Sequence, residues 1–199
     1  MNFNNSETKI NLMRAFAGEC QARMRYVFYA SRAKTQGLQV IAHLFSFVAE
    51  QEKEHAEVFY KALKPVTGEK ILIKNADYPV ELFNDVVVML RKSLENELEE
   101  SDVIYKKFGE IAGEEGFVDV ADKFFLISKI ERLHAARFKV FAELIEEQKM
   151  FKSAQISRWI CLKCGNVHQG NEVPKECQVC GHNFGFFLKD EDFLFVNQV

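Results

Sequence analysis

The chain has 199 residues, of which 48% are hydrophobic and 28% are charged, and its net charge is −3 at pH 7. This length suits one large domain, or a main domain with a small appendage. The small negative charge gives no electrostatic reason to expect a nucleic-acid or anionic-membrane partner. No stretch is long and apolar enough to span a bilayer, and Met1 to Lys9 lack the apolar region of a signal peptide. We therefore expect a cytoplasmic protein.

Composition divides the chain near Lys152-Ser153. Four of the five cysteines and the only tryptophan follow this point, whereas the preceding residues are rich in helix formers. The sequence predicts a main helical domain over residues 1–150 and a small second domain over residues 153–199. Because thiols stay reduced in the cytoplasm, the paired cysteines of the second domain are better metal ligands than disulfide partners.

Four amphipathic segments occupy the first 150 residues, separated by Gly37, by the 65–79 stretch and by the turn at 113–116. In chain order, apolar residues recur at the 3.6-residue helical period over 12–30, 41–59, 83–108 and 120–145. We expect a mainly α fold, a four-helix bundle made of two hairpins. The 65–79 connection is long enough to cross the bundle and set the second hairpin against the first.

Glutamate interrupts each apolar stripe near its middle. The first and third segments carry Glu19 and Glu97, and the third adds Glu100 one turn later. The second and fourth segments carry Glu-x-x-His, as Glu52-Lys-Glu-His55 and Glu131-Arg-Leu-His134. Residues three apart lie on one face of a helix, so each glutamate and histidine of these pairs can share a metal ion.

The glutamates also lie at matching heights, because Glu19 and Glu52 are nearly equidistant from Gly37, and Glu97 and Glu131 from the 113–116 turn. A single Glu-x-x-His is usually a solvated face, but two on core stripes favour a buried site. Burying five unpaired carboxylates would cost about 15 kcal/mol or more, as much as a whole domain's stability. Two ferrous ions would nearly neutralise them. Carboxylates with two imidazoles suit iron or manganese, in the ligand set described for ferritin-like di-iron proteins.

Two matching knuckles, Cys161-Leu-Lys-Cys164-Gly and Cys177-Gln-Val-Cys180-Gly, follow in the second domain. Their four sulfurs predict a tetrahedral site for one iron, with zinc as the alternative, since the spacing does not select the metal. A redox centre on the same chain favours iron, because zinc could deliver no electrons to it. Aromatic residues are expected to form the core of this small β-rich domain: Trp159, Phe184, Phe186, Phe187, Phe193 and Phe195.

Together these residues resemble rubrerythrins, in which a ferritin-like di-iron bundle precedes a rubredoxin-like domain. The resemblance spans essentially the whole chain. It rests on residues 16–23, 51–55, 97–100, 114–117 and 131–134, followed by the two knuckles in that order. One departure is Cys20, which stands beside Glu19 where the family more often has a small hydroxyl residue.

The resemblance implies roles for individual residues. By this resemblance, Glu52 and Glu131 bridge the two irons. One iron is also bound by Glu19 and His55, and the other by Glu97 and His134. Glu100 matches a further carboxylate that can replace His55 when the oxidation state changes. Tyr26 and Tyr105 match tyrosines beside the cluster, so we expect catalytic roles for Glu100 and for these two phenols.

The resemblance further implies a peroxide reductase fed by an NAD(P)H-dependent rubredoxin reductase or by rubredoxin. We therefore expect reduction of hydrogen peroxide to water at an oxo- or hydroxo-bridged di-iron centre, with electrons relayed through the cysteine-bound iron. A homodimer or higher oligomer is expected, with one subunit's cysteine-bound iron near the other's di-iron site. The alternatives are a ferroxidase or iron-handling protein, which needs no cysteine site, and a zinc-knuckle peroxide sensor without turnover.

Overall fold

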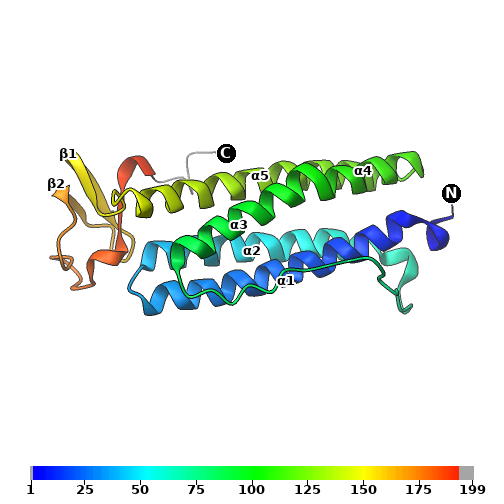
Figure 1. Ribbon diagram of the computed structural model, residues 1–199, viewed down its shortest axis with the longest axis horizontal. Coiled ribbons are helices and arrows are strands. Elements are labelled where there is room, and N and C mark those ends of the chain that lie inside the picture. The colour runs from blue at the N-terminus through cyan, green and yellow to red at the C-terminus, as the bar shows by residue number, and fades with distance from the viewer. Residues whose placement is uncertain (1, 193–199) are drawn as a thin grey trace.

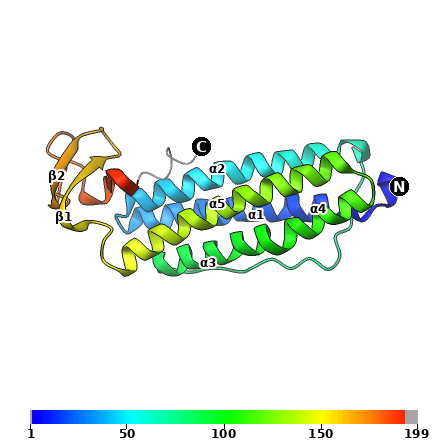
Figure 2. The same cartoon turned by 90° about the horizontal axis from the view of Figure 1, so that it is seen from above.

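The computed structural model describes residues 2–192 as a long helical bundle with a small sheet at one end (Figures 1 and 2). The first hairpin is α1 (Glu7–Thr35) and α2 (Gln39–Ala62). The second pairs α3 (Val86–Glu99) and α4 (Tyr105–Glu114) with α5 (Val118–Glu146). The four-helix bundle predicted from the sequence is therefore confirmed. No helix among residues 2–192 is long and apolar enough to cross a membrane.

Local signals begin and end these helices. The Ser6 side chain accepts a hydrogen bond from the Lys9 amide at the start of α1, over 3.1 Å, and Asp85 caps α3 in the same way through the Val88 amide. Gly37 has φ +77 between α1 and α2, a conformation that glycine adopts without steric cost. The first hairpin therefore turns where the sequence indicates.

The connection between the hairpins runs along the side of α1 for most of the bundle's length (Figures 1 and 2). The short 3-10 helix η2 (Lys64–Val66) precedes it, and α3 follows only at Val86. The crossing therefore extends beyond the predicted 65–79 stretch. Phe83, which the periodicity assigned to the third helix, lies instead in this connection, because the Asp85 cap starts the helix after it.

The third helix of the bundle is interrupted, which differs from the continuous helix that we expected. The π-helix η3 (Glu100–Ile104) separates α3 from α4, and the Tyr105 amide donates to the Glu100 carbonyl five residues earlier. Such a turn shifts the inward face by one residue: Tyr105 is buried, whereas Ile104 and Phe108, expected on the inner stripe, are only partly buried. π-turns are rare and frequently lie at functional sites.

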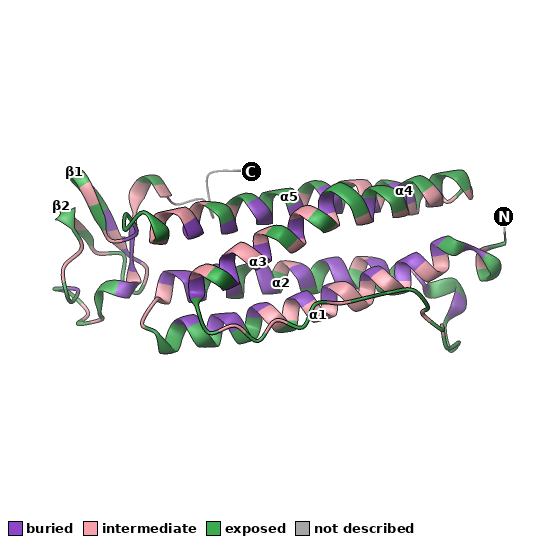
Figure 3. Cartoon of the chain, in the orientation of Figure 1, coloured by how far each residue is buried: buried purple, intermediate pink, exposed green. Residues whose placement is uncertain are grey.

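Two apolar clusters fill the bundle, one toward each end. Tyr26, Phe45 and Phe138 belong to the cluster nearer the sheet, and Phe59 stacks on Phe124 in the other, with ring centroids 4.9 Å apart. Figure 3 shows buried residues along the inner faces of all the helices. In α1, α2 and α5, the glutamate or Glu-x-x-His motif lies between the segments that feed the two clusters. The polar residues therefore form a layer between two apolar clusters.

Up to residue 192, where the described part ends, the second part of the chain is a three-stranded antiparallel sheet of order β2-β1-β3: β1 (Lys152–Cys161), β2 (Val167–Glu172) and β3 (Phe187–Lys189). Trp159 and Phe187 are fully buried beside the cysteines, as predicted, and Phe186 packs against them. Phe184 is 41% exposed and contacts Phe151 instead, so its expected place in this core is wrong. Phe193 and Phe195 lie outside the described residues.

This sheet packs against the end of the first hairpin. Gly185, in the 3-10 helix η4 (Phe184–Phe186), lies so close to the α1–α2 turn that a Cβ there would be 1.7 Å from the Gly37 carbonyl oxygen. Leu188 of β3 is buried in the apolar cluster of the bundle. The cysteines of the sheet region and the glutamate layer of the bundle therefore lie at separate places along one elongated molecule.

Candidate metal centre

Six side chains from four helices converge in the polar layer, and we call them the candidate metal centre: Glu19, Glu52, His55, Glu97, Glu131 and His134. They form two overlapping groups of four, in each of which the possible ligand atoms lie within 4.8 Å of one another. Glu52 and Glu131 belong to both groups. All six residues are buried, with His55 the most exposed at 6%.

The two shared carboxylates span the two imidazoles. His55 Nδ1 lies 3.0 Å from Glu52 Oε2 and 2.9 Å from Glu131 Oε1. His134 Nδ1 lies 2.9 Å from Glu52 Oε1 and 2.8 Å from Glu131 Oε2. Each carboxylate thus presents one oxygen to each side, the arrangement that a bridging ligand requires.

The other two glutamates complete the two halves. Glu19 Oε2 lies 3.9 Å from His55 Nδ1, and Glu97 Oε2 lies 3.4 Å from His134 Nδ1. The structure thus brings together Glu19 with His55, and Glu97 with His134, in the pairs that the resemblance implies.

Buried polar atoms without a hydrogen-bond partner gather at this centre: Glu19 Oε2, Glu52 Oε1, Glu97 Oε2, both carboxylate oxygens of Glu131 and His134 Nδ1. Leaving such atoms unpaired costs about 1–3 kcal/mol each, and more for charged groups. Carboxylate oxygens and two imidazole nitrogens are donors suited to iron or manganese. The residues present therefore fit two metal ions at one site.

Two buried tyrosines hold the unshared glutamates. Tyr105 Oη donates a hydrogen bond of 2.5 Å to Glu19 Oε1, and Tyr26 Oη donates one to Glu97 Oε1. Burial and the neighbouring carboxylates raise the pKa of both phenols well above its ordinary value, so they remain donors. Each bond engages one carboxylate oxygen and leaves the other directed at the centre.

Gln51 is part of the site, although the sequence analysis gave it no role. His134 Nε2 lies 3.0 Å from Gln51 Oε1, which also accepts a hydrogen bond from Arg137 over 3.3 Å. With its proton on Nε2, His134 directs the lone pair of Nδ1 at the centre. Gln51 lies beside the inner stripe of α2 and not on it, so periodicity could not reveal it.

Without metal, the centre retains protons. Burial, then the Glu52 carboxylate, raises the pKa of Glu97 to about 8, and burial with Glu131 and Glu52 raises that of Glu19 well above its ordinary value. Burial opposes ionisation of Glu52, but the two imidazoles outweigh it and lower its pKa to about 2. Burial likewise opposes the His55 cation, yet Glu131 and Glu52 raise its pKa to about 10. Metal ions binding here would displace these protons.

Glu100 lies outside both groups of possible ligands. It begins η3, is partly buried, and its carboxylate has no hydrogen-bond partner among residues 2–192. Burial, followed by the carboxylates of Glu97 and Glu131, raises its pKa well above the ordinary value. With Tyr105 it lines a cavity of about 540 Å³ between α1, η3 and the connection.

The four cysteines of the knuckles form a second site. The Sγ atoms of Cys161 and Cys180 lie 3.8 Å apart, and those of Cys164 and Cys177 lie 3.6 Å apart. Tetrahedral ligands at about 2.3 Å from a metal would be separated by about 3.8 Å. Hydrogen bonds from the Cys180 and Val179 amides are the main cause that lowers the pKa of Cys177 to about 6. The geometry suits one iron or one zinc ion.

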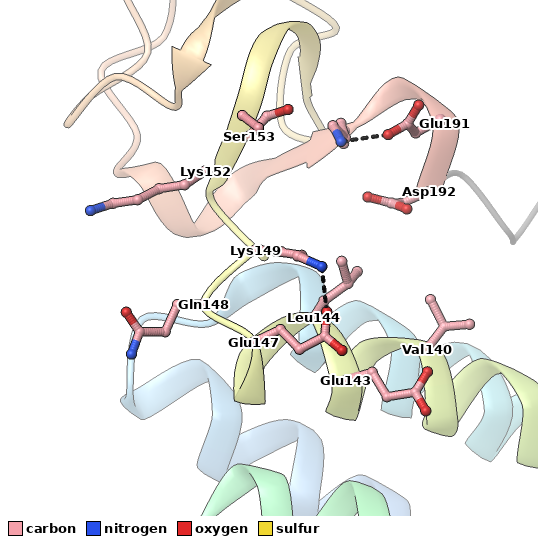
Figure 4. A pocket seen from close by; sticks show the side chains of 12 residues that line it. Val140, Glu143, Leu144, Glu147, Gln148, Lys149, Lys152, Ser153, Glu191 and Asp192 are labelled. Carbon is pink, nitrogen blue, oxygen red and sulfur yellow. Dashed lines mark hydrogen bonds and ion pairs between the residues drawn. The ribbon is translucent and has the colours of Figure 1, made fainter.

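Cys20 directly follows Glu19 but belongs to no group of possible metal ligands, and a second cavity holds none of these ligands either. Cys20 is a partly exposed free thiol on α1, and burial raises its pKa. The second cavity, also about 540 Å³, lies where α5 passes into β1 (Figure 4). Charged side chains from both elements surround it, and Lys149 pairs with Glu147 at 2.6 Å. Its described lining holds neither histidine nor cysteine, so it is no candidate for a redox centre.

Two family models match separate parts of this chain. The model described as rubrerythrin matches residues 11–142, and that described as the rubredoxin-like domain of rubrerythrin matches residues 159–187. A rubrerythrin of Clostridium perfringens is 44% identical over 183 residues, which cover 92% of this chain and 93% of that protein. A rubrerythrin of Nitratidesulfovibrio vulgaris is 37% identical over 177 residues, covering 89% and 91%.

Solved structures show the same architecture. Nigerythrin in a mixed-valence state has a TM-score of 0.61 and 26% identity, covering 92% of this chain and 86% of that one. A bacterioferritin of Desulfovibrio desulfuricans, at 21% identity, shares the fold of the bundle with a TM-score of 0.63, covering 72% and 82%. The bundle is thus ferritin-like, and it carries the glutamates and histidines of a di-iron carboxylate site beside a rubredoxin-like four-cysteine knuckle. The chain therefore belongs to the rubrerythrin family.

Proposed function

We propose that this protein reduces hydrogen peroxide to water at a di-iron centre and receives its electrons through an iron bound by four cysteines. The observation that carries the proposal is the way in which Glu52 and Glu131 each span His55 and His134 at the middle of the bundle. We assign Glu52 and Glu131 as bridging ligands, with Glu19 and His55 on one iron and Glu97 and His134 on the other.

When bound, two ferrous ions would supply the two electrons needed to cleave the peroxide O–O bond, and an iron held by the four cysteines would supply electrons one at a time. We assign catalytic roles to three residues near this centre: Glu100, Tyr26 and Tyr105. Tyr26 and Tyr105 hold Glu97 and Glu19 by hydrogen bonds and keep their protons. The Glu100 carboxylate, at the start of η3, would replace His55 on its iron when the oxidation state changes.

The position of the cysteine site favours transfer between two chains. The α1–α2 turn contacts η4, and Glu52 lies about 20 Å along the axis from the first residue of α2, at 1.5 Å per residue. Electron tunnelling slows exponentially with distance, so a route within one chain would be slow. We propose a homodimer in which the cysteine site of one chain lies beside the di-iron centre of the other.

Electrons would reach the cysteine site from an NAD(P)H-dependent rubredoxin reductase or from rubredoxin. Cys164, a knuckle cysteine, is exposed, which gives such a donor an approach to the sulfurs. We place the protein in the cytoplasm, where thiols stay reduced and can serve as metal ligands.

A stopped-flow comparison of oxidants tests the reaction. The fully reduced holoprotein should be reoxidised faster by hydrogen peroxide than by dioxygen, because we assign peroxide as the substrate. The reverse order would reject the peroxidase assignment in favour of a ferroxidase. Steady-state turnover in an NADH-coupled assay with a rubredoxin reductase should be lost or strongly reduced in Glu100→Ala.

Metal analysis and a visible spectrum test the remaining alternative. Iron bound by four thiolates absorbs visible light, whereas zinc does not. A protein that is colourless at the cysteine site when loaded in iron-replete cells would instead be a zinc-knuckle sensor.

A further inference from the structure

We propose that the cavity between α1, η3 and the connection binds small uncharged organic hydroperoxides, which the same centre reduces to alcohols. We call it the η3 cavity. This inference rests on the proposed peroxide reduction and adds a second class of substrate to it.

The η3 cavity reaches the candidate metal centre. Glu100 and Tyr105 both line it, and Tyr105 Oη donates its 2.5 Å hydrogen bond to Glu19 Oε1. Gly18, which also lines it, directly precedes Glu19 on α1. A molecule in the cavity is therefore separated from the centre by the Glu100 side chain and by one phenol.

The η3 cavity is much larger than hydrogen peroxide requires. Its volume is about 540 Å³, whereas a site for one water molecule needs only about 10–15 Å³ measured in this way. Pockets that hold whole small organic molecules have volumes of about 300–1,000 Å³. The space beside the centre can thus accommodate a hydroperoxide that carries an organic group.

The walls of the cavity favour an organic group without charge. Apolar surface comes from α1, the connection, η3 and α4, through Ala15, Pro79, Val103 and Phe108 respectively. Tyr78 also lines the cavity, and its hydroxyl already donates to the Arg14 carbonyl over 3.1 Å. An alkyl or aryl group can therefore pack against the cavity while the O–O group faces Glu100.

Each of the two cations that line the cavity on α1 lies beside a carboxylate. The Arg14 guanidinium donates to Glu7 Oε1 and to the Lys74 carbonyl, over 2.5 and 2.7 Å. Arg25 Nε lies 3.7 Å from Glu81 Oε2. Lys107, the third cation of the lining, shares it with the carboxylates of Asp77 and Glu99. The cavity therefore carries no excess positive charge to hold an anion, so a neutral hydroperoxide fits better than an anionic one.

The chemistry balances with the donor already proposed. An organic hydroperoxide, two electrons and two protons give one alcohol and one water, as the O–O bond breaks and each oxygen ends with a proton. The electrons are the two that hydrogen peroxide would consume, and they come from the same reductase. The alcohol remains in the cavity until it dissociates, so product binding reports on the cavity without turnover.

Paired tryptophan substitutions test this proposal. Val103 on η3 lines the cavity and is 59% exposed, whereas Leu126 on α5 lies outside it and is 58% exposed. Val103→Trp should fill the cavity from η3, and Leu126→Trp is the matched control. Ala76→Trp fills it from the connection, independently of the helix.

The readouts are turnover of cumene hydroperoxide and hydrogen peroxide by the holoprotein, and calorimetric binding of cumyl alcohol to the resting holoprotein. We expect both substrates to be reduced and cumyl alcohol to bind. Val103→Trp and Ala76→Trp should lower the ratio of kcat/KM for cumene hydroperoxide to that for hydrogen peroxide by about tenfold or more, as pocket contacts of this size do. Val103→Trp and Ala76→Trp should also weaken the binding of cumyl alcohol. Leu126→Trp should change neither the kcat/KM ratio nor the binding of the alcohol.

Four outcomes would overturn the inference. Cumene hydroperoxide could be inert while hydrogen peroxide oxidises the reduced protein, which leaves the proposed function standing. Cumyl alcohol could fail to bind to the holoprotein. Both tryptophan variants could also leave the ratio of the two kcat/KM values unchanged, which would mean that the cavity does not bind the organic substrate. If neither oxidant reacts with the reduced protein, the proposed function fails together with this inference.

Discussion

His134 donates a hydrogen bond from Nε2 to Gln51 Oε1 over 3.0 Å, while its Nδ1 lies 2.8 Å from Glu131 in the candidate metal centre. The Gln51 amide thus fixes one ring nitrogen of His134, and the other ring nitrogen faces the candidate metal centre. Arg137 donates to the same amide oxygen and keeps it oriented. Gln51 therefore decides both the tautomer and the orientation of a proposed ligand, although it touches no metal itself.

Gln51→Leu should weaken iron binding at the bundle. Loss of such a partner typically costs 10–100-fold in metal affinity, because the imidazole is no longer held in one tautomer and orientation. A competitive chelator titration measures the affinity, and iron at the cysteine site should be unchanged. Gln39→Leu, at the start of the same helix, is the control. Equal affinities for Gln51→Leu and wild type would mean that packing alone orients His134.

Removing one phenol hydroxyl should destabilise the protein. Tyr105→Phe leaves Glu19 Oε1 buried without its donor, which should lower the free energy of unfolding by about 1–3 kcal/mol. Tyr60→Phe is the matched control, since Tyr60 is 57% exposed and keeps its stacked contact with Phe16 through the ring. That change should stay within about 0.5 kcal/mol. Urea unfolding of the metal-free proteins measures both, and equal midpoints would contradict the role of this bond.

The metal-free protein should lose stability as pH rises from 6 to 9. The folded-state pKa of Glu97, about 8, lies above its ordinary value of 4.5, so its contribution to stability is present below 4.5 and lost as pH rises toward 8. The contribution of His55 is similarly present below 6.5 and lost as pH rises through about 10. Glu52, with its pKa lowered to about 2, acts in the opposite direction but only below pH 4.5.

The expected change over this range is on the order of a few kcal/mol, since one pKa unit corresponds to about 1.4 kcal/mol. Urea unfolding of the metal-free protein at pH 6 and pH 9 measures it. Glu97→Gln should reduce the slope, because the amide has no proton to lose. A free energy of unfolding that is constant or rises with pH would show that the buried carboxyls do not retain their protons.

The helices and the metal-binding pattern could be predicted from sequence because both follow the helical period. Glu52 and His55 are on one face by spacing alone, and the turn at Gly37 sets Glu19 level with them. Such signals are local, and the positions of the turns predict which residues of neighbouring helices lie at the same height in the bundle. The cysteine knuckles are equally local, since each pair is separated by only two residues.

Other features depended on contacts that spacing does not encode. The π-turn at Glu100 inserts one residue into the helical period, and Tyr105 takes the buried place expected for Ile104. Gln51 meets His134 only after two hairpins have packed together. The η3 cavity depends on the path of the connection beside α1, which contains no regular element from which a position could be predicted.

Gly185→Ala should separate the cysteine module, residues 152–192, from the bundle. The added Cβ would lie 1.7 Å from the Gly37 carbonyl oxygen, and backbone on both sides prevents a small adjustment. The module should therefore move away from the α1–α2 turn, which increases the radius of gyration measured by X-ray scattering. Helical circular dichroism and the iron content of both sites should remain unchanged, because neither site includes this contact.

Gly113→Ala is the control for this substitution, since its Cβ would lie 4.0 Å from Ala121 Cβ, an ordinary contact. Scattering from this variant should match that of the wild type. If electrons pass between two chains, detaching the module should also slow NADH-coupled turnover while leaving the single oxidation of the reduced centre by peroxide intact. An unchanged scattering curve for Gly185→Ala would show that the module does not rest on this turn in solution.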